Sequence, residues 1–141
     1  MASAAPLRGL AALLDRPGDP LDVVPPLGHW LYFLPDTPQS AIADDGHPKL
    51  GSDLPDFGLP RRMWAGGRVE FVQPIPVGSA LRKETTLIEM SRKTGSSGPL
   101  AFVTLRHEIQ SDGRTAVIEE GLHFDLRRLY SIISALSCAS C

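Results

Sequence analysis

The stretch LPRRMWAGGRVEFVQPIPVG, residues 59–78, decides the fold that the sequence predicts. Its middle part alternates between polar and apolar residues, and Val69 and Phe71 lie on one face of the predicted strand. Pro74 and Pro76 end this strand, since a proline has no N–H group to donate to a neighbouring strand. The chain is therefore expected to leave the sheet here through a turn.

Three more strands are predicted downstream, at residues 80–92, 100–110 and 115–124. A polar turn at residues 94–99 and a Ser-Asp-Gly turn at residues 111–113 separate them. Four consecutive strands with tight turns predict an antiparallel meander. The third strand is nearly continuous in apolar residues, which is typical of a central, covered strand.

The remaining segments divide the chain into one domain and two flanks. Residues 7–14 carry apolar side chains at helical spacing, so residues 1–20 are predicted to be a helix and a linker. Residues 21–125 form the predicted domain, and residues 126–141 form an atypical tail. Residues 35–60 show no apolar period and are predicted to be a long loop, which in a compact domain is usually functional or bound to a partner.

Composition narrows the class of protein. The chain has 141 residues, the size of one ordinary domain, with 43% hydrophobic and 21% charged residues. Its net charge of −2 and the lack of a basic stripe argue against nucleic acid or a membrane surface as partner. No apolar run approaches the roughly 20 residues that span a bilayer. Cys138 and Cys141 build no disulfide framework, which favours a cytoplasmic location; a mitochondrial one is the alternative.

Three stretches in a fixed order carry a resemblance to a known family. They are HWLYFLP at residues 29–35, LPRRMWAGGR at residues 59–68 and SGPLAFVTLRHEI at residues 97–109. Over about residues 10–120 the chain resembles the amino-terminal half of two-part MaoC-like acyl-thioester hydratases, the mesaconyl-CoA and 3-methylfumaryl-CoA hydratase type. The resemblance implies an α+β fold, a hotdog-like antiparallel sheet with a degenerate central helix region.

The resemblance also implies that catalysis belongs to the other half of the enzyme. Hydration of an enoyl thioester needs a carboxylate and an imidazole on one water, which the family supplies as Gly-Asp-x-Asn-Pro-x-His. The residues five positions before the four histidines are Val24, Ile42, Phe102 and Ile118. None is acidic, so no catalytic residue is assigned, and the chain alone is expected to be inactive or nearly so. No cofactor or metal is expected, and coenzyme A enters only as part of the substrate.

Candidate binding residues for the thioester lie in the stretch that decides the fold. Two guanidinium groups, at Arg61 and Arg62, could hold the phosphates of coenzyme A through paired donors. Trp64, Gly66 and Gly67 would then line the thioester tunnel. The alternative is a solvated strand entrance with a glycine bulge.

The histidines offer weaker candidates. His29, with Trp30, lines an acyl pocket or is a hydrogen-bonded histidine in an aromatic core cluster. His47 is expected in a turn, with a metal site as the alternative. His107 is expected in a cross-strand pair, and His123 at a solvated position.

Two other functions stay open at this point. The chain could be an acyl-thioester-binding module without turnover, paired with a catalytic hotdog half or with a second copy of itself. It could also be a stand-alone hotdog thioesterase, which would need a carboxylate aimed at the thioester. The loop offers several carboxylates and nothing selects one of them: Asp36, Asp44, Asp45, Asp53 and Asp56.

Overall fold

The structure is a computed structural model that describes residues 1–16, 18, 21–43, 46–49, 59, 61–95 and 98–126, without the side chains of residues 61, 62, 95 and 124–126. The predicted tail at residues 126–141 lies outside this description apart from the backbone of Leu126. None of the described helices has the length and apolarity needed to cross a membrane.

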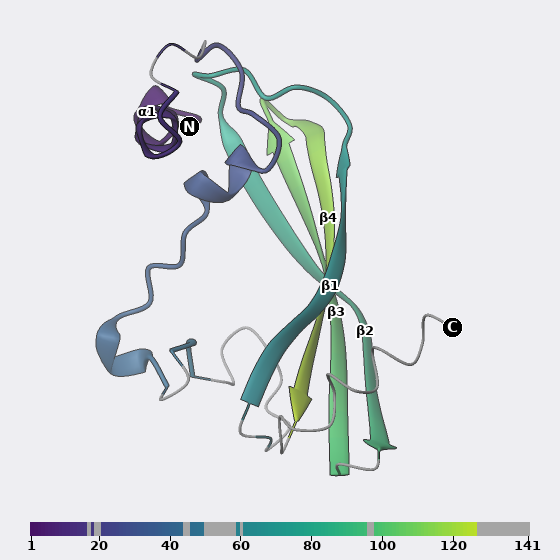
Figure 1. Cartoon of the computed structure of the whole chain (residues 1–141). Coiled ribbons are helices and arrows are strands. Elements are labelled where there is room, and N and C mark those ends of the chain that lie inside the picture. The colour runs from purple at the N-terminus through teal and green to yellow at the C-terminus, as the bar shows by residue number, and fades with distance from the viewer. Residues whose placement is uncertain are drawn as a thin grey trace. The chain divides into compact units, whose positions relative to one another are not determined.

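Four strands make one sheet in the order β1-β4-β3-β2 (Figure 1). The strands are β1 (Arg61–Phe71), β2 (Leu81–Gly95), β3 (Gly98–Ser111) and β4 (Arg114–Leu126). They are preceded by the helix α1 (Ala4–Leu13) and by two short 3-10 helices, η1 (Gly28–Tyr32) and η2 (Gln39–Ala41). The predicted fold class, a hotdog-like antiparallel sheet with a degenerate helix region, is confirmed.

The predicted meander is wrong in one respect, because β1 pairs with β4 and not with β2. The connection at residues 72–80 does not turn back on β1. It pairs instead with the approach segment before η1, where Val24 N–H donates to the Ile75 carbonyl at 2.9 Å and Val77 N–H donates to the Asp22 carbonyl at 2.9 Å. The two prolines of this connection cannot extend a strand ladder, so the chain passes from one edge of the sheet to the other.

The described chain divides into two compact units. Unit 1 comprises residues 1–36, 68–86 and 106–120, and unit 2 comprises the residues between and after them. Unit 1 contains a hydrophobic core whose buried members come from the amino terminus, α1, the approach segment, the β1–β2 connection, β3 and β4: Ala2, Leu7, Val24, Ile75, Ile109, Ala116 and Val117.

The amino-terminal segment is part of the core of unit 1 rather than a flank. Ala2 and Leu7 are buried. The backbone of Ala2 pairs with the β1–β2 connection, donating to the Ser79 carbonyl at 2.8 Å and accepting from Gly78 N–H at 2.8 Å. The helix expected from the period of residues 7–14 therefore exists, and its buried face closes one side of the core.

In unit 2, the central strand β3 buries Ala101 and Val103, as its continuous apolar sequence predicts. The edge strand β2 contrasts with it. Its side chains Leu87, Ile88 and Met90 are 47%, 52% and 53% exposed. Because adjacent residues of a strand point to opposite faces, β2 presents apolar side chains on both faces.

Candidate functional site

The short helix η1 presents His29 and Trp30 from a tight backbone turn. Leu27 has a left-handed backbone, with φ of 66°, which reverses the chain after two prolines. Gly28 N–H donates to the Pro25 carbonyl at 2.8 Å, and Trp30 N–H donates to the Leu27 carbonyl at 3.1 Å. These bonds hold the two aromatic side chains next to β4.

Gly28 has no room for a side chain. An added Cβ would lie 2.9 Å from Val24 Cγ1 and 3.0 Å from Pro25 Cδ, and the proline ring cannot move aside. We expect Gly28→Ala to lower the free energy of unfolding by about 1–3 kcal/mol, as overpacking of a well-packed site does. Thermal unfolding measures the loss. Gly9→Ala is the control, because nothing lies within 4 Å of its added Cβ in the interior of α1 and the change should raise stability. Equal effects of the two substitutions would contradict the predicted clash.

The hydroxyl of Tyr32 ties η1 to the amino terminus, donating to the Ser3 carbonyl at 2.8 Å. Burial raises the pKa of the Tyr32 phenol above its usual range. The phenol therefore stays protonated at physiological pH and remains a donor to this carbonyl.

Glu119 on β4 contacts the side chains of both His29 and Trp30. Its Oε2 accepts a hydrogen bond from Trp30 Nε1 at 2.9 Å and lies 3.4 Å from His29 Nε2. The imidazole is only 2% exposed, and the carboxylate 21%. An ionised carboxylate can only accept, so a hydrogen bond between the two requires the proton on Nε2. A carboxylate and an imidazole thus meet although they lie 90 positions apart in the sequence.

The His29 ring is also part of an aromatic cluster. It lies edge-on to Trp30, with ring centroids 5.7 Å apart, and to Phe71, with centroids 6.4 Å apart. The hydrogen-bonded histidine in an aromatic core is therefore confirmed. His29 also lines a cavity, and its role in binding an acyl group stays a prediction.

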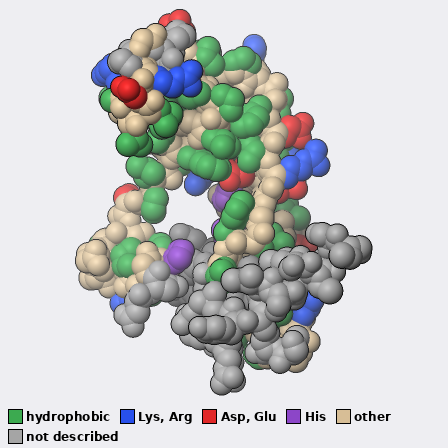
Figure 2. Space-filling view, in the orientation of Figure 1, with side chains coloured by type: hydrophobic (Ala, Val, Ile, Leu, Met, Phe, Trp, Pro, Cys, Tyr) green, Lys and Arg blue, Asp and Glu red, His purple; other side chains and the backbone are tan. Residues whose placement is uncertain are grey.

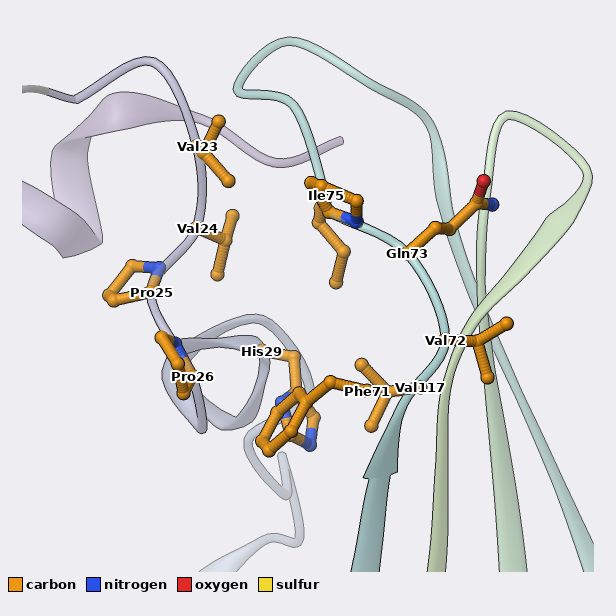
Figure 3. A pocket seen from close by; sticks show the side chains of 11 residues that line it. Val23, Val24, Pro25, Pro26, His29, Phe71, Val72, Gln73, Ile75 and Val117 are labelled. Atoms are coloured by element: carbon orange, nitrogen blue, oxygen red, sulfur yellow. The ribbon is translucent and has the colours of Figure 1, made fainter.

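The cavity lies within unit 1, between the approach segment, the end of β1 with its following connection, and β4 (Figure 3). Its volume is about 370 Å³, inside the range of roughly 300–1,000 Å³ for small-molecule sites. Its polar lining residues are His29 and Gln73, and the other nine are apolar: Val23, Val24, Pro25, Pro26, Phe71, Val72, Pro74, Ile75 and Val117. In the space-filling view, hydrophobic side chains gather over the region that carries α1 and the β1–β2 connection (Figure 2).

The other predicted binding residues belong to unit 2. Trp64 is 65% exposed. A Cβ added at Gly121 would lie 3.8 Å from Trp64 Nε1 and 3.3 Å from His123 Nε2, so the Trp64 and His123 side chains both approach this glycine. His123 is half-buried rather than fully solvated as predicted, and its Nε2 lies on the side of Gly121 where a side chain would stand.

For the remaining binding candidates, Arg61, Arg62, Gly66 and Gly67, the structure describes the backbone and no contact that would indicate a binding role. The side chains of Arg61 and Arg62 lie outside the described residues. Gly66 has no atom within 4 Å of the position where a Cβ would stand, and Gly67 is exposed. Their role in binding coenzyme A stays a prediction.

The structure also describes the contacts of two further histidines, His107 and His47. His107 Nδ1 lies 2.8 Å from Thr85 Oγ1 on the neighbouring strand, which confirms the cross-strand pair. His47 closes a turn, with its carbonyl accepting from Ala43 N–H at 2.8 Å and Gly46 at φ 80°. Asp44 and Asp45 lie outside the described residues, and no group of three metal-ligating side chains occurs among the rest.

Sequence reasoning missed Glu119, although a weak signal for it exists. Glu119 lies two positions after the buried Val117 and so shares its face of β4, while Glu120 points to the other face. An acidic residue in register with a buried valine indicates a carboxylate with a partner.

The family of the chain follows from its sequence match. Residues 27–130 match the family model of hydroxyacyl-thioester dehydratase type 2. The chain belongs to this family. The match includes η1, all four strands, Glu119 and every predicted binding residue.

One curated relative of this dehydratase-family chain is a mesaconyl-C(4)-CoA hydratase from Chloroflexus aurantiacus. The two are 43% identical over 113 residues, which make up 78% of this chain. The chain spans only 40% of the length of that relative.

Two solved structures are also similar to the chain. One is a thioesterase from Thermus thermophilus complexed with coenzyme A and zinc, with 15% identity, a TM-score of 0.39 and coverage of 52% of this chain and 57% of that one. The other is the ChsH1-ChsH2 complex from Mycobacterium tuberculosis, with 10% identity, a TM-score of 0.45 and coverage of 50% and 40%.

Proposed function

We propose that this chain is the non-catalytic half of an acyl-thioester hydratase or dehydratase and that it shapes the acyl-CoA tunnel. One observation carries the proposal. The chain belongs to a hydroxyacyl-thioester dehydratase family, yet no acidic residue stands five positions ahead of any of its histidines. In the proposed enzyme, the catalytic carboxylate and imidazole lie in the other half.

The candidate residues form two groups, one in each unit. His29 and Trp30 lie at the cavity in unit 1 or next to it, and we assign them to the acyl part. Trp64, Gly66 and Gly67 are assigned to the coenzyme A part, because the space beside Gly66 is open. Arg61 and Arg62 are assigned to the phosphates of coenzyme A, which paired guanidinium donors suit.

The proposed partner is a catalytic hotdog half or, failing that, a second copy of the chain. Support comes from β2, an edge strand that leaves Leu87, Ile88 and Met90 about half exposed. An apolar edge strand is a surface that proteins usually cover. No cofactor beyond the coenzyme A of the substrate is part of the proposal, and its cytoplasmic setting remains an expectation.

A hydratase assay on the chain alone and on a mixture tests the proposal. The substrates are crotonyl-CoA and mesaconyl-CoA, and loss of the enoyl-thioester absorbance reports turnover. The mixture adds the part of the Chloroflexus relative that this chain does not match. We expect turnover only in the mixture, because general acid–base groups contribute a factor of roughly 10²–10⁴ each.

A substitution at Gly66 tests the proposed position of the tunnel in the same assay. Gly66→Leu fills space that is open in the structure, so it should preserve folding and reduce turnover of the mixture by raising KM. A mixture without turnover, despite a complex seen by size-exclusion chromatography, would refute the half-enzyme proposal.

The His29–Glu119 pair supports a second candidate, in which the chain turns over enoyl thioesters by itself. The oxygen of water would bond to the β-carbon, while one of its protons passes through the imidazole to the α-carbon. Glu119 would orient the imidazole through its contact at 3.4 Å. Turnover by the chain alone that is lost in His29→Gln would establish this candidate in place of the first.

A further inference from the structure

Among the residues that the structure describes, none that lines the cavity in unit 1 has a basic side chain that could neutralise an anion. None of its eleven lining residues is Lys or Arg. The imidazole of His29 is its one ionisable group, and that imidazole already faces the carboxylate of Glu119.

From this lining we infer that the cavity takes an uncharged aliphatic acyl group and discriminates against acyl groups that end in a carboxylate. The inference rests on the proposed function, namely that the chain binds acyl thioesters. It deepens that function by naming the substrate class. A mesaconyl thioester carries a free carboxylate, so the inference separates this chain from the substrate in the name of its relative.

The physical reason is the cost of removing a carboxylate from water. A carboxylate in this cavity would lose hydration and meet valine, proline and phenylalanine side chains instead of a cation. Transfer of an aliphatic chain into the same cavity lowers the free energy, because burial of each methylene group is favourable.

The geometry of the cavity supports an aliphatic occupant. In Figure 3 the side chains of Val23 and Val24 lie on the side of their segment towards Ile75, and Phe71 lies beside the His29 ring. Val24 and Ile75 are buried, whereas Val23 is 45% exposed. Val24 and Ile75 therefore line the cavity as part of the core. Val23 is exposed, so a new side chain at this position should not disturb that core.

Isothermal titration calorimetry of the full chain tests the inference with matched ligands. Butyryl-CoA and succinyl-CoA have acyl chains of the same length and differ in the terminal carboxylate, and free coenzyme A gives the reference affinity. We expect butyryl-CoA to bind at least tenfold more tightly than succinyl-CoA. Hexanoyl-CoA should bind roughly fifteenfold more tightly than butyryl-CoA, since each of its two additional methylenes contributes a factor of about four.

Val23→Arg places a cation at the cavity and should reverse the preference, with a gain of at least tenfold for succinyl-CoA and a loss for butyryl-CoA. Leu13→Arg makes the same charge change on α1, where Leu13 is 82% exposed and does not line the cavity, and should leave both affinities as they are. Pro26→Arg, at another exposed lining residue, serves if Val23→Arg does not fold.

The outcomes separate the inference from the proposed function. Equal affinities for butyryl-CoA and succinyl-CoA, both above that of free coenzyme A, would overturn the selectivity and leave thioester binding intact. Unchanged affinities in both cavity variants would overturn the assignment of this cavity to the acyl group. Absence of binding by every acyl-CoA would overturn the proposed function as well.

Discussion

Replacing Glu119 with alanine is expected to lower the free energy of unfolding by about 2 kcal/mol, because it removes the acceptor of a buried imidazole and of an indole N–H. The imidazole of His29 is 2% exposed and cannot turn to water for a new partner. Trp30 is 49% exposed, so its N–H can be hydrated and contributes less to the loss.

Urea unfolding measures the free energy, and tryptophan fluorescence reports the local change. In a Trp64→Phe background Trp30 is the remaining tryptophan, and its emission should shift to longer wavelength when Glu119 is removed. Glu119→Gln keeps a side-chain oxygen that accepts from Trp30 and should recover part of the loss. The matched control is Glu120→Ala, since the bond of Glu120 to Arg106 at 3.2 Å joins two half-exposed groups and such pairs contribute about 0–1 kcal/mol.

An equal loss of stability in Glu119→Ala and Glu120→Ala would contradict the role of Glu119. It would mean that the carboxylate near His29 is solvated in the same way as its neighbour. An unchanged emission maximum of Trp30 would contradict the hydrogen bond at 2.9 Å directly.

Ile109→Ala is expected to lower the free energy of unfolding by about 3–4 kcal/mol. Ile109 is 1% exposed and lies on β3 in the core of unit 1. Truncation removes apolar contacts and leaves a cavity that the surrounding strands cannot close, which is the reason for losses of about 2–5 kcal/mol at such positions. The midpoint of urea unfolding should fall, with little change in the slope of the transition.

Ile88→Ala is the matched control, with the same change of side chain on β2. Ile88 is 52% exposed, so its truncation should cost less than about 1 kcal/mol in the monomeric chain. A loss as large as that of Ile109→Ala would contradict the exposed state of β2, and would indicate that a second copy covers this strand in solution.

The strand positions could be predicted because a half-buried strand leaves a period of two in its sequence. Residues 80–92, 100–110 and 115–124 correspond to β2, β3 and β4 within a few residues at each end. The helix before them could be predicted for the equivalent reason, since its buried Leu7 recurs with Leu10 at helical spacing.

The candidate site was predictable only in part. His29 and Trp30 were found because they stand together in an aromatic run. Glu119 was not found, because its contact with His29 joins residues 90 positions apart and no local period records such a contact. A search for a carboxylate at fixed spacing from each histidine detects pairs on one segment and misses this one.

By itself, the sequence determined where the strands lie, which family the chain belongs to, and that the Asp–His motif of hydration is absent. These properties are local, since each depends on residues within one strand or one motif. The tertiary structure alone decided that β1 pairs with β4, that Ala2 belongs to the core, and that Glu119 meets His29 and Trp30 beside an apolar cavity. These depend on which distant segments satisfy each other's backbone and bury each other's side chains, so they follow from folding of the whole chain.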